Sequence, residues 1–195
     1  MQIDARLNIV IPLELNGSRV HVHSTPISLE VFEQFFDVLA KAYNEVIRLG
    51  IDSPVSIRTA RLWLRKMAAD AGRMEEVQNG LINEIHRLTN MLVMSAKGWE
   101  TVPFQQMIQG EKFAVEEVSE IENALIFFTF VSHLTERSKR TISQKGVAGV
   151  LNGQATSLNC TEYAASLPTS TAPVSSGEAA KPAQEPDKPA SSVAY

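Results

Sequence analysis

Two histidines near the N-terminus have the residue type and spacing that can begin a metal site. His21 and His23 are two residues apart in an alternating stretch, so on a strand both rings project from one face. Two imidazoles can start a zinc site, but their expected cross-strand neighbours, Pro12 and Val10, supply no ligand. We therefore expect a solvated polar face at this position, and we expect no metal and no cofactor.

The other reactive side chains show no catalytic spacing. Cys160 is the single cysteine, and no histidine or lysine stands beside it to lower its pKa. His86 and His133 lie on separate expected helices, without a cysteine or carboxylate pattern nearby. The acidic residues are interpreted as helix-face and helix-dipole charges: Glu75, Glu76, Glu116, Glu117, Glu120 and Glu122. Without a phosphate loop, a nucleophile elbow or paired cysteines, the sequence predicts that the protein is not an enzyme.

One stretch, IRTARLWLRKMA at residues 57–68, gathers basic side chains on an expected helix. Its basic residues are Arg58, Arg61, Arg65 and Lys66. Such a helix could contact phosphates, although an amphipathic helix with a cationic outer face is the simpler interpretation. The net charge is −4, whereas proteins that follow a nucleic-acid backbone usually present a basic face. Nucleic acid is therefore not an expected partner.

The composition is that of an ordinary globular protein. Of the 195 residues, 44% are hydrophobic and 21% are charged, which allows one folded domain with an appendage. The first ten residues lack the basic and then apolar pattern of a signal peptide. The longest apolar run, residues 124–131, is far shorter than the roughly 20 residues that a membrane span needs. We expect an intracellular protein that does not enter a membrane.

The elements that must position these residues begin with a β-hairpin. Asn16-Gly17 separates two alternating runs, LNIVIPLEL and SRVHVHS, and both turn residues tolerate a positive φ. The turn sets the register, with Leu15 opposite Ser18. The apolar set that then shares the buried face is Ile9, Ile11, Leu13, Val20 and Val22. Pro12 has no N–H to donate to a neighbouring strand, so its backbone nitrogen should face an open sheet edge.

Three helices are expected after the hairpin. The first begins at the N-cap Ser28 and extends to about residue 50. The second spans residues 54–72 and the third residues 74–92, both with apolar residues at the helical period. Gly80 lowers the helical propensity of the third by about 1 kcal/mol relative to alanine.

A fourth long helix is expected to start near Val115, after a loop at residues 98–113 that contains one short helix. Its middle, residues 124–131, is apolar nearly all round, so it is either the central helix of the bundle or a partner surface. Its far end is expected to carry Arg137, Lys139 and Arg140. Residues 144–153 predict at most a short, weak helix.

Together these elements predict an α+β fold that is mainly α. An N-terminal β-hairpin packs on a bundle of about four helices, with a disordered C-terminal arm. The expected domains are residues 1–155, the hairpin plus helical domain, and residues 156–195, a linker motif and a Pro/Ala/Ser/Thr-rich tail. Five of the nine prolines follow Ser166, without a periodic apolar face to offset the entropy cost of ordering.

Several stretches together resemble one family of bacteriophage proteins. They are STPISLEVFEQFF, LINEIHRLTNML, GWETVP, VSEIENALIFFTFVSH and TSLNCTEYAASLPTST. With the hairpin, over about residues 7–170, they are similar to the tail assembly chaperones of long-tailed, siphovirus-like phages. These small proteins are encoded between the major tail protein and the tape-measure protein, and the family has no diagnostic catalytic motif.

The resemblance implies a binding protein with two partners, the phage tape-measure protein and the tail-tube protein. Such chaperones coat the long, helical, aggregation-prone tape-measure protein and help to recruit tube subunits to it. They act in the host cell cytoplasm and are not retained in the mature virion. They are often made in two lengths, the longer by a programmed ribosomal frameshift. The sequence leaves a homo-oligomer open.

A chaperone for a helical client needs exposed apolar surface on a soluble body. The candidate partner-binding residues are Phe32, Phe35 and Phe36 on the first helix, Leu125, Phe127, Phe128 and Phe130 on the fourth, and Leu158, Tyr163 and Leu167 before the tail. Most of the first two groups must also fill the core of a domain of this size. The last group marks the transition to a flexible arm suited to capturing tube subunits, and the edge at Pro12 suits pairing with another subunit.

Two other functions stay open at this point. A structural component of the phage particle, such as a tail-completion protein, would be found in purified virions, from which a chaperone is absent. A helical DNA-binding regulator would use the basic stretch at residues 57–68, and its binding to duplex DNA would weaken steeply with salt.

Overall fold

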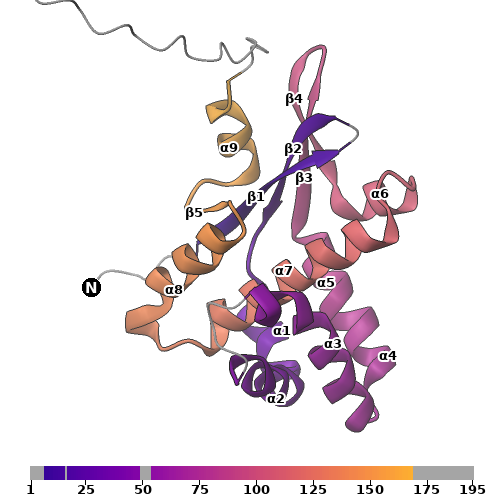
Figure 1. The fold of residues 1–195 in the computed structure, drawn as a ribbon, viewed down its shortest axis with the longest axis vertical. Coiled ribbons are helices and arrows are strands. Elements are labelled where there is room, and N and C mark those ends of the chain that lie inside the picture. The colour runs from indigo at the N-terminus through magenta and orange to yellow at the C-terminus, as the bar shows by residue number, and fades with distance from the viewer. Residues whose placement is uncertain (1–6, 16, 49–53, 169–195) are drawn as a thin grey trace, which may run out of the picture.

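The computed structural model describes residues 7–15, 17–48 and 54–168, which form a five-stranded antiparallel sheet with helices against both faces (Figure 1). The strands are β1 (Asn8–Leu15), β2 (Ser18–Ser24), β3 (Thr89–Ser95), β4 (Gly98–Pro103) and β5 (Gln154–Thr156). They lie in the order β4-β3-β2-β1-β5. The predicted α+β class with an N-terminal hairpin is confirmed.

The helices vary from single turns to the 20 residues of α7. They are α1 (Leu29–Gln34), α2 (Phe36–Ile47), α3 (Pro54–Asp70), α4 (Met74–Glu76), the π-helix η1 (Val77–Ile82), α5 (Asn83–Arg87), α6 (Phe104–Gln109), α7 (Val115–Leu134), α8 (Arg137–Val150) and α9 (Cys160–Ser166). The tail that was predicted to be disordered lies outside the described residues from residue 169 onward.

The hairpin has the predicted register, with Leu15 opposite Ser18 and the pairing continuing to Ile9 and Ser24. Gly17 has a φ of 75°, as the turn requires. The predicted apolar face is the one that packs on the helices. β5 pairs with β1 only from Asn8 to Val10, so the same edge of β1 is open at Pro12 within the described part of the chain.

Helix α7 is the centre of the larger core, between the sheet and the α2–α3 pair in Figure 1. Every residue from Ile121 to Ser132 is buried. Of the two interpretations of its apolar middle, the central helix is the one observed. Its buried hydroxyls have partners: Thr129 Oγ1 donates to the Leu125 carbonyl at 2.9 Å, and Ser132 Oγ accepts from Gln144 Nε2 at 2.9 Å.

A buried carboxylate joins α7 to two other helices. Glu122 is 7% exposed, and its two carboxylate oxygens lie 2.5 Å from Arg61 Nε of α3 and 3.0 Å from His86 Nε2 of α5. The interpretation of Glu122 as a helix-face charge was therefore wrong. A carboxylate in the interior is stable only with such partners, so this contact sets where α3 and α5 lie against α7.

The third predicted helix ends earlier than expected, because its last residues belong to the sheet. Helical structure runs from Met74 to Arg87, and β3 then pairs with β2 on one side and β4 on the other. Met91 and Leu92 are both fully buried, since helices cover both faces of this strand. The predicted loop at residues 98–113 likewise contains β4, and its short helix after Pro103 is confirmed as α6.

The C-terminal helices also differ from the predictions. Thr135 has an extended backbone that ends α7, so the basic residues expected at its far end, Arg137, Lys139 and Arg140, lie on α8 instead. α8 has 14 residues, where a short weak helix was predicted. Residues 156–168, interpreted as a linker, complete β5 and form α9, whose N-cap is the Asn159–Glu162 capping box.

Gly80 and Gly146 form a matched pair of helical glycines, and substitution by alanine should affect them in opposite ways. A Cβ on Gly80 would stand 2.6 Å from Cζ of the buried Phe35 ring, while a Cβ on Gly146 meets nothing within 4 Å. We expect Gly146→Ala to raise the free energy of unfolding by about 0.5–1 kcal/mol. Gly80→Ala should lower it by about 1–3 kcal/mol, because the core has no room for the methyl group. Guanidinium unfolding measures both, and a stabilised Gly80→Ala variant would contradict this packing.

Candidate interaction surfaces

The first candidate surface is an apolar stripe along α1 and α2. Its residues recur every three or four positions, as on one side of a helix: Leu29, Phe32, Phe36, Ala40, Tyr43 and Ile47. The exposed fractions are 53% for Leu29, 52% for Phe36 and 38% for Ile47. The adjacent side of α2 is the buried one, so the helix has more apolar surface than the core covers.

The inner border of the stripe is held by the C-terminal half of α7. The Phe32 ring stacks on His133, with ring centroids 4.7 Å apart, and meets Phe36 edge-on at 5.7 Å. Tyr43 contacts Phe130 at 5.9 Å. Ser28 caps α1 by accepting the Val31 N–H at 3.2 Å, as predicted. The stripe is therefore fixed in place and does not need to order before it binds.

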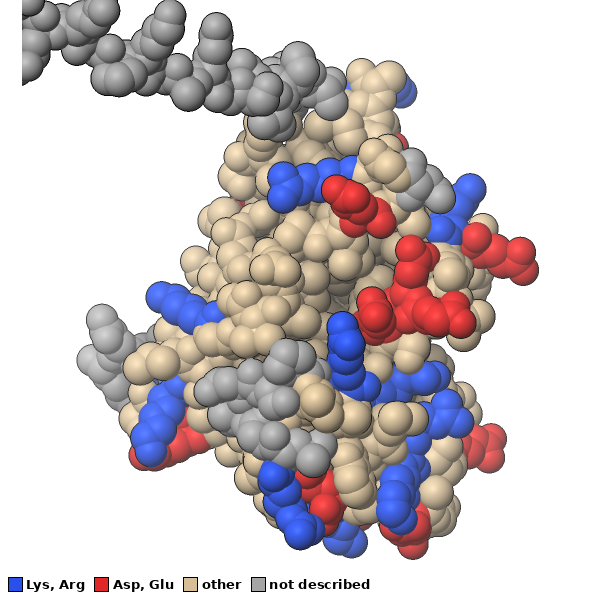
Figure 2. All heavy atoms as spheres, in the orientation of Figure 1, with Lys and Arg blue, Asp and Glu red and all other residues tan. Residues whose placement is uncertain are grey.

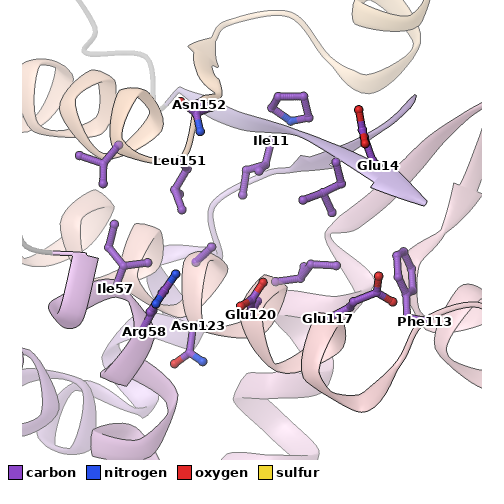
Figure 3. A pocket seen from close by; sticks show the side chains of 15 residues that line it. Ile11, Glu14, Ile57, Arg58, Phe113, Glu117, Glu120, Asn123, Leu151 and Asn152 are labelled. Carbon is purple, nitrogen blue, oxygen red and sulfur yellow. The ribbon is translucent and has the colours of Figure 1, made fainter. Parts of the chain in front are cut away.

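The second candidate surface is a groove that opens beside the free edge of β1. Figure 2 shows a hollow in this face with acidic and basic side chains around it, and Figure 3 shows the residues that line it. Its cavity volume is about 440 Å³. It is lined by Ile11, Pro12, Leu13, Glu14, Ile57, Arg58, Phe113, Glu117, Glu120, Ile121, Asn123, Ala124, Val150, Leu151 and Asn152. The lining comes from β1, α3, α7 and the connection from α8 to β5.

The groove has an apolar floor with a charged rim. Glu14 and Glu117 lie near one end and Arg58 near the other, with Glu120 between them (Figure 3). Glu117 also caps α7, because its Oε2 accepts the Ala114 N–H at 2.7 Å. Within the described residues, Glu14 and Glu120 have no ion-pair partner. The rim is therefore mainly acidic and can receive a cation.

The third candidate surface is the sheet face that α9 covers. His21 is 7% exposed and His23 is 1% exposed, so the prediction of a solvated polar face was wrong. The His21 ring lies 5.2 Å from Trp99 and 5.9 Å from Tyr163 of α9. His23 Nε2 donates to the Leu158 carbonyl at 3.1 Å, and Trp99 Nε1 donates to the Pro168 carbonyl at 3.0 Å.

Burial shapes the ionisation of this cluster. It lowers the pKa of both histidines, and the positive charge of Arg19 lowers the pKa of His21 further. Burial also raises the pKa of the Cys160 thiol, whose Sγ lies 3.9 Å from Thr101 Oγ1. The thiol therefore has less thiolate than an exposed cysteine and is a poor nucleophile at neutral pH.

The residues that the sequence singled out for binding separate into three groups. Five are buried in the larger core: Phe35, Leu125, Phe127, Phe128 and Phe130. Phe32 and Phe36 meet on the stripe. Tyr163 of α9 is buried against the sheet, Leu167 packs in the same cluster, and Leu158 is 37% exposed. The groove was not predicted, because it exists only where four separate elements meet.

Comparison of the chain with protein-family models, with curated proteins and with solved structures finds no match. In the described part of the chain, no three His, Cys, Asp or Glu side chains are grouped so as to hold a metal ion. No helix in the described ranges has the length and apolar character needed to cross a membrane.

The contact between α9 and the sheet should weaken in acid. His21 and His23 are neutral when covered, with a lowered pKa, whereas released side chains would titrate near 6.5. The released state binds more protons as the pH falls below 6.5, so docking is strongest above that value and weakens below it. We expect hydrogen exchange of the α9 amides, corrected for intrinsic rates, to rise severalfold between pH 7.5 and 5.

A variant in which both histidines are replaced, His21→Phe with His23→Gln, is the control. The phenyl ring keeps the aromatic contacts of residue 21, and the glutamine amide can still donate to the Leu158 carbonyl. Its corrected exchange in α9 should be nearly independent of pH. Equal pH profiles for this variant and the unmodified protein would show that the histidines do not control the docking of α9.

Proposed function

We propose that this protein is a phage tail assembly chaperone that binds the tape-measure protein, keeps it soluble and helps to recruit tail-tube subunits. The resemblance of the stretches quoted above suggests the class of protein. The observation that carries the proposal is the apolar stripe on α1 and α2, because an exposed helical stripe is the surface that a helical client requires.

The geometry of the stripe favours a helical partner. Its residues are three or four positions apart, which is the spacing at which two helices pack along a seam. The stripe spans two helices, because the helical backbone breaks at Phe35; on α2, from Phe36 to Ile47, it covers 11 residue steps, or about 17 Å. Its exposed aromatic and aliphatic side chains, Leu29, Phe36 and Ile47, give a client helix large apolar groups to contact, and aromatic anchors such as Phe36 contribute most in such contacts.

The stripe also has the polar border of a surface that must stay soluble before it binds. On the outer side of the same helices, Glu33, Asp37 and Asn44 are exposed. Arg73 holds Asp37 at 2.6 Å, so part of this border is fixed. An apolar strip with a charged margin on one side allows a client helix to dock in one place and discourages general aggregation.

The recruitment of tube subunits is proposed for the C-terminal segment, the role that the family resemblance gives to it. Because β5 and α9 pack on the sheet, the truncation that separates this role from the fold removes residues 169–195 and keeps Tyr163 and Leu167 in place. This truncated chain should still solubilise the tape-measure protein and should fail to bind tube subunits.

Co-expression with the tape-measure protein encoded beside this chain tests the main proposal. The unmodified chain should keep the client in the soluble fraction and co-purify with it. Leu29→Asp with Phe36→Asp should reduce the soluble client by more than about tenfold, because two anchors become charged. Leu62→Asp is the matched control, since Leu62 is 62% exposed on α3 and is not a residue of the stripe, and this variant should act like the unmodified chain.

Two outcomes would contradict the proposal. One is a client that precipitates equally with and without the chain. The other is equal client recovery with the stripe variant and with the control. Mass spectrometry of purified virions then separates the remaining classes, because a chaperone is absent from the particle and a structural component such as a tail-completion protein is present in a fixed ratio.

A further inference from the structure

Helix α8 has one face that belongs to the core and one that faces solvent. On the inner face, Gln144, Val147 and Ala148 are buried, and Gln144 Nε2 donates to Ser132 Oγ of α7 at 2.9 Å. The solvent face repeats every three or four residues and consists of Lys139, Ile142, Lys145 and Gly149. We call these four residues the α8 outer face. The helix is thus anchored without any contribution from its outer face.

The centre of the α8 outer face is an unusual residue for open solvent. Ile142 is 74% exposed, and a lysine lies three residues away on each side. Gly149 on this face, and Gly146 next to it, have open space where a side chain would stand, so another backbone can approach closely. α8 carries four basic residues and no acidic one, and Lys139 is paired with the N-cap residue Glu136 at 3.0 Å. Lys145 is therefore the lysine of this face that has no ion-pair partner in the described part of the chain.

The groove has the complementary chemistry. Its floor is apolar, with Ile11, Ile121 and Leu151 among the lining residues, and its rim carries Glu14 and Glu120 without ion-pair partners in the described part of the chain. Lys139 and Lys145 are six residues apart, so they are about 9 Å apart along the helix axis. A cavity of about 440 Å³ is large enough for the Ile142 side chain together with the methylene stems of the lysines.

The groove and the α8 outer face of one molecule cannot contact each other. The groove lies at the C-terminal end of α8, where Val150, Leu151 and Asn152 line it (Figure 3). Ile142 stands two turns earlier on the solvent side of the same rigid helix. The acidic, apolar groove of one molecule can therefore meet the basic, apolar helix face only on a second molecule.

We propose that the groove is the binding site for the α8 outer face of a second copy of this protein. Ile142 enters the groove, Lys145 pairs with the rim carboxylates of Glu14 and Glu120, and Lys139, which Glu136 holds at 3.0 Å, lies beside them. The contact joins two different surfaces, so repetition of it builds a ring or a chain unless two copies exchange both contacts and close as a dimer. It uses none of the stripe residues and is independent of the proposed function.

Sedimentation velocity of the full chain, from low micromolar to several hundred micromolar, tests the association. The unmodified protein should associate with concentration, and 0.5 M salt should weaken this association because the contact is partly ionic. Ile142→Asp, on the helix side, and Glu120→Lys, on the groove side, should each weaken association by more than about tenfold. Leu29→Asp should leave it unchanged, because Leu29 is 53% exposed and lies on α1, which does not line the groove.

Mixing separates this contact from any other. Ile142→Asp retains an intact groove, and Glu120→Lys retains an intact α8, so the two variants should form a one-to-one heterodimer that neither forms alone. Glu120→Lys combined with Lys145→Glu in one chain should recover part of the association. All of these residues are exposed, and melting temperatures by circular dichroism check that each variant is folded.

Three results would overturn the proposal. The first is an unmodified chain that stays monomeric up to several hundred micromolar. The second is association of a folded Ile142→Asp variant at the strength of the unmodified protein. The third is a mixture of the two variants that stays monomeric although the unmodified protein associates, since this would place the contact elsewhere.

Discussion

The fold depends on burying α7 along most of its length. A helix that is covered on all sides must satisfy every polar group it carries, because water cannot reach them. Glu122 is the most demanding of these groups: its Oε1 lies 3.0 Å from His86 Nε2 of α5, and its Oε2 faces the positive charge of Arg61 of α3. The apolar residues of α7 contact the sheet on one side and α2 and α3 on the other. The positions of the surrounding elements follow from these requirements.

This arrangement also decides which surfaces are free to bind. The aromatic residues of α7 are used by the core, so they cannot also form an exposed contact. The remaining apolar surface lies in two places. Along α1 and α2, the helices carry more apolar residues than the core covers. Between the free edge of β1 and α7, the packing leaves the groove open. The stripe and the groove therefore both lie at the border of the larger hydrophobic core.

The sequence predicted elements whose signals are local. The turn position of Gly17, the Ser28 N-cap, the start of α3 at Pro54 and the start of α7 at Val115 each depend on a few neighbouring residues, and all four agree with the structure. The hairpin register agreed as well, because a two-residue turn leaves no freedom in pairing.

The parts that could not be predicted depend on distant partners. β3 is covered on both faces, so Met91 and Leu92 are both buried and the strand shows no alternation that would separate it from a helix. β5 has three residues, and its approach to β1 requires Gly153, where a Cβ would overlap the Val10 carbonyl. His21 and His23 suggested a polar face only because nothing in the hairpin reveals that α9 covers it.

The separation of the two proposed contacts has a consequence for binding a long helical client. Each copy presents one stripe on α1 and α2, and a single stripe, about 17 Å long on α2, gives a limited contact. Copies that associate through the groove and α8 leave their stripes free, because no residue is shared between the two surfaces. Several linked stripes on one client would then raise the overall affinity by about 10²–10⁴ through effective concentration alone. Weak individual contacts of this kind allow a linked array to bind tightly as a whole and still be released one contact at a time.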